Sequence, residues 1–271
     1  MVIAPAERME ATRPMATRQN VANLTAAELA AWRQVIARSA AIHDNRGYVY
    51  FAGLHGLPNQ DCQHSNLLFL PWHRAYLYSL EMALRDIDGS VSLPWWDWTS
   101  DDSHLRGLPA AYTDTSGSNP LLAGETGLPQ RTLDQIRAQL PDVLDFSVNP
   151  PRTVRAPGPP AELPSPATIQ SILEASTFDD FSSQLEDQHN LVHGWVGGAM
   201  SIVPIAAFDP IFFAHHTMID RLWYLWQLRN PNAGAGTLQL DQALPGTTLN
   251  VGQVLDISRL GYDYATTVTA A

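Results

Sequence analysis

The 271-residue sequence predicts a mainly α-helical protein, a four-helix bundle with long irregular Pro/Gly-rich loops and a few short strands. Three observations carry this prediction. Apolar residues recur with a helical period in several long segments, prolines cluster near the middle of the chain, and the histidines gather in two groups on either side of that cluster. No linker or internal repeat divides the chain, so we expect residues 1–271 to form a single domain.

The first expected helix spans residues 20–38. Thr25 can cap it while Glu28, three residues later, reaches back to the cap, the arrangement called a capping box. A second helix is expected over 66–85. Because proline is tolerated only in the first turn of a helix, regular structure should begin just before Pro71.

The segment 93–98 follows, and it is too aromatic and rigid for a solvent loop, so we expect a buried turn packed on the helices. Residues of about 105–166 are rich in proline with clusters of Gly, Ser and Thr, which indicates an irregular insertion over the surface. A short helix near 133–140 is expected to interrupt it.

A third helix is expected over 178–196 and a fourth over 209–228. Asp209 and Pro210 would open the fourth helix as its N-cap and first residue. The chain beyond residue 230 is rich in Gly and Thr, and we expect short strands there.

Charge and composition exclude several function classes. The chain carries 16 basic and 27 acidic side chains, a formal net charge of −11, and no lysine. An acidic chain without a basic tract binds nucleic acid and anionic membrane surfaces poorly. No apolar run approaches the roughly 20 residues of a membrane helix, and the single cysteine excludes an internal disulfide. Without a visible secretory signal the default compartment is cytoplasmic, with partner-assisted secretion as the alternative.

The second histidine group has the spacing of a metal site. His189 and His193 are four residues apart, so on a helix they lie on one face and can share a metal. His215 and His216 are adjacent and point about 100° apart, so one of them can face the metal while the other does not. Asp220 lies four residues after His216 and could orient its imidazole, or could instead pair with an arginine.

The first group contributes His55, His64 and His73, at intervals of nine residues. Three neutral imidazoles per metal, with no carboxylate or thiolate ligand, favour copper over a hard cation. A zinc hydrolase or a structural metal domain is the alternative. Asn190 stands where the HExxH motif of zinc proteases has its glutamate, which argues against a hydrolase.

Longer motifs surround these histidines. They are His55-Gly56-Leu57-Pro58, Cys62-Gln63-His64, Phe69-Leu70-Pro71-Trp72-His73-Arg74, His189-Asn190-x-x-His193, and Asp209-Pro210-Ile211-Phe212-Phe213-x-His215-His216 with Asp220-Arg221-Leu222-Trp223. Together they resemble the two copper-binding regions of type 3 copper proteins, which are tyrosinases, catechol oxidases and molluscan haemocyanins. Arg18 and the segment Gly261-Tyr262-Asp263-Tyr264 resemble the elements that pack together at the ends of the tyrosinase core, so the resemblance covers about 18–264.

The resemblance implies one copper-binding domain with two copper ions and O2 as co-substrate. The first copper would take His55, His64 and His73, and the second would take His189, His193 and His216. His216 is chosen over His215 because the second histidine of such a pair is the family's ligand. His43 is an alternative to His55, because bacterial tyrosinases often show a longer first spacing. Cys62 precedes His64 by two residues, and in some members such a cysteine forms a thioether to the second ligand.

The resemblance further implies a phenol oxidase that uses O2 to convert o-diphenols to o-quinones and also hydroxylates monophenols. Glu186 and Asn190, four apart on one helix face, resemble a pair that holds a water near the copper as a base for monophenols; a solvated surface acid is the alternative for Glu186. Val203 resembles the residue that controls access above the first copper, and its small size predicts an open site.

Other activities share this copper site. The alternatives are an o-aminophenol oxidase, a catechol oxidase without monophenolase activity and, as a different class, a haemocyanin-like oxygen carrier. The modest length, with no evident shielding domain or multi-domain repeat, argues against the carrier. Its substrate would be a small phenol or aminophenol. Some bacterial relatives require a small copper-delivery partner, which is an open possibility for this chain.

Overall fold

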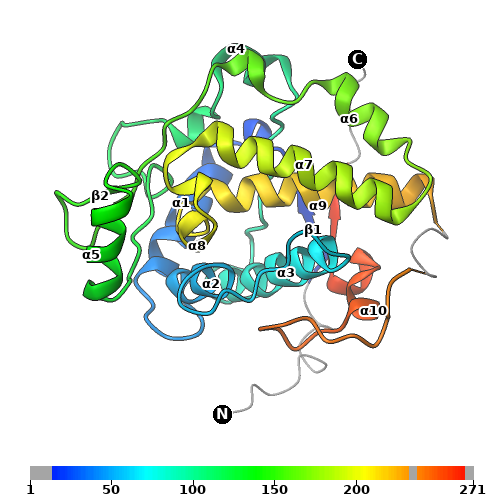
Figure 1. The fold of residues 1–271 in the computed structure, drawn as a ribbon, viewed down its shortest axis with the longest axis horizontal. Coiled ribbons are helices and arrows are strands. Elements are labelled where there is room, and N and C mark those ends of the chain that lie inside the picture. The colour runs from blue at the N-terminus through cyan, green and yellow to red at the C-terminus, as the bar shows by residue number, and fades with distance from the viewer. Residues whose placement is uncertain (1–13, 232–236, 266–271) are drawn as a thin grey trace.

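The computed structural model describes residues 14–231 and 237–265, and it is mainly α-helical, as predicted. The helices are α1 (Ala26–Ala40), α2 (Tyr48–His55), α3 (Phe69–Ile87), α4 (Asp101–Arg106), α5 (Gln130–Gln139), α6 (Pro166–Leu173), α7 (Phe178–Val196), α8 (Val203–Ala206), α9 (Ile211–Arg229) and α10 (Val251–Val254). Helices α7 and α9 run side by side, α3 packs on both of them, and α2 packs on α3 (Figure 1). None of the described helices is long and apolar enough to cross a membrane.

Two short sheets complete the described structure. Strand β1 (Ala16–Arg18) pairs in parallel with β4 (Tyr262–Tyr264), so the two ends of the described chain meet. Strand β2 (Leu144–Asp145) pairs antiparallel with β3 (Arg152–Thr153) inside the insertion. The strands expected in the tail are therefore confirmed at β4, and the partner of β4 comes from the other end of the chain.

Helix α1 begins where the capping box predicts. The Thr25 hydroxyl accepts from the Glu28 N–H at 3.2 Å, and the Glu28 carboxylate accepts from the Thr25 N–H at 2.8 Å. This reciprocal pair satisfies two donors that the first turn of a helix leaves free. The helix is shorter at its start than the expected 20–38, because Val21–Asn23 form a separate 3₁₀ turn before the cap.

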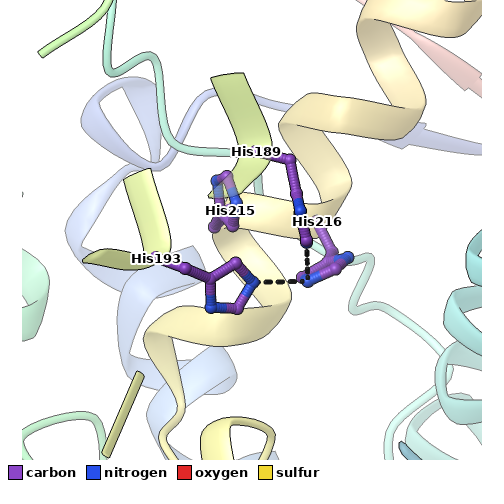
Figure 2. Close-up of side chains that lie close together, drawn as sticks. All are labelled: His189, His193, His215 and His216. Carbon is purple, nitrogen blue, oxygen red and sulfur yellow. Dashed lines mark hydrogen bonds between the residues drawn. The ribbon is translucent and has the colours of Figure 1, made fainter. Parts of the chain in front are cut away.

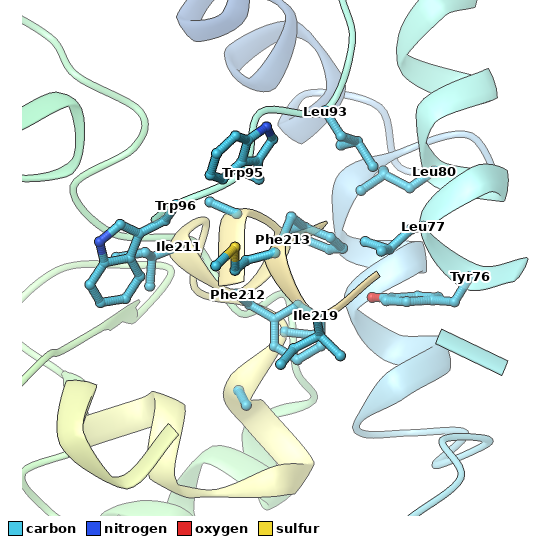
Figure 3. Close-up of a cluster of buried hydrophobic side chains, with 14 of the residues drawn as sticks. Tyr76, Leu77, Leu80, Leu93, Trp95, Trp96, Ile211, Phe212, Phe213 and Ile219 are labelled. Carbon is cyan, nitrogen blue, oxygen red and sulfur yellow. The ribbon is translucent and has the colours of Figure 1, made fainter. Parts of the chain in front are cut away.

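The longer helices agree closely with their predictions. Helix α7 has the expected bounds, and α3 carries Pro71 in its first turn. Helix α9 starts one residue later than expected: Pro210 and not Asp209 is the N-cap, and the Asp209 carboxylate accepts from the Ile211 N–H at 3.1 Å. The apolar core between α3 and α9 includes Leu77, Phe213 and the aromatic segment 93–98, whose Trp95 and Trp96 are buried as predicted (Figure 3).

Helix α2 was not expected from the sequence. Its residues are almost uniformly apolar and all but two of the eight are buried, so no polar face marks a helical period. The helix ends at Gly56, where the chain passes very close to α8. A Cβ at Gly56 would lie 2.2 Å from the Pro204 carbonyl oxygen, and the Leu57 N–H donates to that same oxygen at 2.8 Å. The contact holds the end of α2, and with it His55, against α8.

The proline-rich insertion is irregular but firmly attached. The Arg155 guanidinium forms an ion pair with Asp209 at 2.6 Å, beside the start of α9, and donates to the carbonyls of Tyr112 and Leu121. One buried arginine thus joins distant parts of the insertion to the bundle. The expected short helix near 133–140 is present as α5.

A buried cluster of charges lies between α3, α9 and the paired strands. Arg18 forms ion pairs with Glu81 at 2.7 Å and with Asp220 at 3.0 Å, and its guanidinium lies 3.5 Å from the Tyr262 ring centroid. Arg74 forms a second ion pair with Asp220. Buried charges stabilise a fold only when they are paired and fully hydrogen-bonded, and this cluster meets that condition.

The expected contact between Asp220 and the imidazole of His216 is therefore not present. The Asp220 carboxylate points instead to Arg18, Arg74 and the hydroxyls of Tyr262 and Tyr264. Burial by itself would raise the pKa of Asp220, but the charges of the two arginines outweigh it, and the pKa is lowered. Asp220 is thus ionised at neutral pH, and its role is to join α9 to α3 and β1.

Replacing Asp220 by Ala should lower the free energy of unfolding by about 3–5 kcal/mol, because it leaves two buried arginines without their shared counter-charge. Urea unfolding of the metal-free protein measures this. Asp44→Asn removes an ion pair that lies on the exposed surface and should leave the midpoint unchanged. Equal midpoints for the wild type and the Asp220 variant would contradict the role given to this cluster.

Candidate metal centre

The bundle brings together the histidines that the sequence places far apart. His55 ends α2, His64 lies in the loop between α2 and α3, His73 lies on α3, and α7 and α9 contribute the second group. Ring nitrogens fall within 4.8 Å of one another in two imidazole sets. The sets are His55, His73 and His216, and His189, His193, His215 and His216.

In the second group three imidazoles converge on one point. The Nε2 atoms of His189 and His193 lie 3.2 Å and 3.1 Å from Nε2 of His216, as the dashed lines in Figure 2 show. If all three Nε2 atoms carry lone pairs, no proton lies between them, and they cannot form hydrogen bonds with one another. Three nitrogens directed at one point are, however, the arrangement that a metal ion requires.

In the first group the rings of His55, His64 and His73 form a compact triangle. Their centroids are 5.5, 5.1 and 5.6 Å apart. His55 and His73 are buried, and Nε2 of His73 has no hydrogen-bond partner. A buried nitrogen without a partner is costly unless another ligand completes it, so the site fits a bound metal.

Backbone carbonyls fix the orientation of two of these rings. Nδ1 of His73 lies 2.7 Å from the Phe69 carbonyl oxygen, and Nδ1 of His193 lies 2.7 Å from that of Met200. Because a carbonyl oxygen only accepts, each Nδ1 must carry the proton, and each Nε2 keeps its lone pair. Both rings therefore present a metal-binding nitrogen toward their own group.

Burial keeps these imidazoles neutral. It lowers the pKa of His64 and of His193 to about 4, and in His193 the Met200 carbonyl acts in the opposite direction. Burial, reinforced by the neighbouring rings, also holds the pKa values of His55, His73 and His216 well below their usual range. At neutral pH all of them keep the lone pair that binding a metal requires.

The structure separates the candidate histidines from the others. His43 is exposed and belongs to none of the sets, which favours His55 as the first ligand. His104 lies near the Pro164 carbonyl and also outside the sets. His215 is also a member of the second set, but it is His216 whose Nε2 both α7 histidines approach, at 3.2 Å and 3.1 Å.

A pocket of about 330 Å³ leads from the surface to both groups of histidines. Glu186, Asn190 and Val203 all line it, as the sequence-based expectations require. Val203 is 49% exposed and stands at the mouth, while Met200 is buried deeper inside. A volume of about 330 Å³ lies at the small end of ligand pockets and is sufficient for one aromatic ring.

Three parts of the site were not predicted. The Phe212 ring stacks on His216, with centroids 3.9 Å apart, and meets His55 edge-on, so it fills the space between the two groups. Gly194 lines the pocket, where a Cβ would meet open space. Ser65 donates its N–H to Glu186. Phe212 belonged to a recognised motif and could have been singled out, but nothing in the sequence marks Ser65 or Gly194.

Known proteins share this arrangement. The profile of the common central domain of tyrosinase matches residues 45–229. The tyrosinase of Streptomyces glaucescens is 33% identical over 250 residues, 81% of this chain and 85% of that protein. Hemocyanin units G and H of Sepia officinalis are 31% identical over 232 residues, 78% of this chain and 37% of that protein.

Solved structures agree in fold. A functional unit of octopus hemocyanin superposes with a TM-score of 0.76 at 26% identity, covering 92% of this chain and 68% of that one. A tyrosinase from Burkholderia thailandensis superposes with a TM-score of 0.71, covering 95% of this chain and 75% of that one. At 21% identity the second likeness shows the fold alone.

Replacing His55 by Ala should remove a large part of the copper that the wild type binds, because one site loses a third of its donors. Replacing His43 by Ala should leave the copper content unchanged, since that side chain is exposed and belongs to none of the sets. Metal analysis of both variants after reconstitution and dialysis measures this. Loss of copper in the His43 variant alone would reverse the assignment.

Proposed function

Since the chain belongs to the tyrosinase family of copper oxidoreductases, we propose that it is a phenol oxidase that oxidises o-diphenols to o-quinones with O2 and also hydroxylates monophenols. The observation that carries the proposal is the gathering of neutral imidazoles from α2, α3, α7, α9 and the loop before α3, four of which line one open pocket. His55, His64 and His73 would hold one copper ion, and His189, His193 and His216 the other.

The copper pair, when bound, supplies the electron transfer between phenol and O2. The chain holds both triads in place through buried helices and keeps each imidazole neutral, so that the metals retain their positive charge and can attract a phenolate. The pocket admits a flat ring past Val203 and excludes larger groups from the triads.

Glu186 and Asn190 are proposed to handle the phenolic proton. Both line the pocket, and the side-chain amide oxygen Oδ1 of Asn190 lies 3.1 Å from Nδ1 of His189. Partial burial raises the pKa of Glu186, while the hydrogen bond from the Ser65 N–H acts against that rise. A raised pKa makes the carboxylate a better proton acceptor for a monophenol, directly or through a water.

An oxygen carrier is the second candidate, because hemocyanins are among the relatives. A carrier needs a passage for O2 only, whereas the pocket beside Val203 has room for an aromatic ring. This difference supports an oxidase. Catechol or aminophenol oxidation without monophenol hydroxylation remains an alternative within the same site, and a small copper-delivery partner is compatible with it.

Oxygen uptake by the copper-reconstituted protein should occur with catechol and with a monophenol. Tyramine is a suitable monophenol beside tyrosine, since no arginine lines the mouth to hold a carboxylate. Uptake with catechol or o-aminophenol alone would reassign the enzyme to those substrates. No uptake with any of them, in protein that holds its full copper, would favour the carrier. A His193→Ala variant is the inactive control.

A thioether between Cys62 and His64 is also proposed. The Cys62 sulfur lies within 4.8 Å of ring nitrogens of His55 and His64, and burial raises the thiol pKa to about 11, so the sulfur carries its proton until it reacts. A new bond from sulfur to a His64 ring carbon would replace one S–H and one C–H bond, with O2 at the copper site as oxidant.

The intact mass of the wild type should fall by the mass of two hydrogen atoms after copper loading, and the mass of the Cys62→Ser variant should not change. An unchanged mass would contradict the thioether.

A further inference from the structure

We propose that Glu186 is a positioning residue that fastens the loop carrying His64 to helix α7. The Glu186 carboxylate accepts a hydrogen bond of 2.7 Å from the Ser65 backbone N–H. Ser65 directly follows His64 in the chain. The inference rests on the proposed function only in taking His64 as a copper ligand, since the contact itself belongs to the metal-free chain.

Few hydrogen bonds tie this loop to the rest of the described structure, although Cys62 packs on the core and the His64 ring contacts Phe69 and His189. Within the described structure, the other hydrogen bonds of residues 62–67 stay inside the loop or link it to its immediate neighbours, such as Asn66 to the His64 carbonyl. The bond to Glu186 is the one that reaches a distant element, 121 residues away. A loop with so few hydrogen bonds to the rest of the molecule opens easily unless such a bond holds it closed.

The His64 ring lacks the hydrogen bond that orients the His73 and His193 rings. His73 and His193 are each held through Nδ1 by a backbone carbonyl. The hydrogen bonds of the described residues include none to the His64 ring, which is only partly buried. The direction of its metal-binding nitrogen is therefore set by the backbone position of the loop.

The backbone conformation of Ser65 also indicates that the loop is held in place by its surroundings. Its φ of 56° lies in the left-handed region, which residues other than glycine adopt rarely and only when their surroundings hold them there. The hydrogen bond to Glu186 is such a support. Glu186 is only 7% exposed, so water molecules rarely replace the Ser65 N–H as the donor to its carboxylate.

Glu186 also links the two halves of the centre. It precedes His189 by three residues and so lies on the same face of α7. The His64 and His189 rings stack across the gap, with centroids 5.5 Å apart and planes at 28°. One carboxylate thus fixes the first-site loop relative to a ligand of the second site. Its other oxygen stays available to the pocket, so positioning and proton transfer do not exclude each other.

The test compares three variants of the full chain. Glu186→Ala removes the acceptor, Glu186→Gln keeps a carbonyl oxygen that can accept from Ser65, and Asp187→Ala is a matched control that removes the exposed neighbouring acid. In metal-free protein, amide exchange of a peptide covering 62–67 should accelerate about tenfold or more in Glu186→Ala, because the Ser65 N–H loses its hydrogen-bond acceptor altogether. Exchange in Glu186→Gln and Asp187→Ala should stay close to the wild type, and α7 peptides should be unaffected.

Copper competition with a chelator supplies the second measurement. Glu186→Ala should release one class of copper about tenfold more readily and leave the other class unchanged, and Glu186→Gln should restore both. Unchanged exchange of 62–67 in Glu186→Ala would overturn the proposal, as would equal weakening of both copper classes. A wild type that oxidises no phenol would refute the proposed function, whereas the exchange result would still stand.

Discussion

The buried charge cluster of Arg18, Glu81, Arg74 and Asp220 is the constraint on which the metal centre depends. Arg74 follows His73 on α3, and Asp220 lies one helical turn after His216 on α9. An ion pair between these two neighbours sets how α3 and α9 lie against each other. The same relation brings the His73 and His216 rings to a centroid distance of 4.6 Å. Packing alone allows helices to slide, but paired charges in an apolar interior have one favourable register.

Within that arrangement of α3 and α9, three of the imidazoles each have a support of their own. A carbonyl on the preceding helical turn orients His73, a carbonyl in the 3₁₀ turn after α7 orients His193, and the Phe212 ring lies flat on His216. These supports are backbone atoms or apolar surfaces, so none of them competes with the histidines as a ligand. The resulting site is rigid, neutral and open on one side, which is what a redox metal pair that meets a flat aromatic substrate requires.

Much of this could be predicted from the sequence, because long helices with an apolar period and motifs around the histidines leave local signals. Helix α7 has the predicted bounds for that reason. Helix α2 could not be predicted, since burial on nearly all sides removes the polar face that marks a period. For Asp220 the sequence left two alternatives, His216 or an arginine. The arginine alternative is correct, but its partners Arg18 and Arg74 could not be identified, since they lie 202 and 146 residues away. Contacts of that range depend on the tertiary fold, as does the bond between Ser65 and Glu186.

The parallel ladder between β1 and β4 has a mechanical consequence. The ladder is flanked by bonds from the Ala16 N–H to the Gly261 carbonyl and from the Ala265 N–H to the Arg18 carbonyl. A force that pulls the two chain ends apart acts along these strands in opposite directions, so it shears the ladder and loads its hydrogen bonds together. In an antiparallel pair pulled from adjacent ends, the hydrogen bonds would instead be loaded and broken one after another. Since Arg18 joins the ladder to the charge cluster, the chain resists tension at the element that also aligns its metal-binding helices.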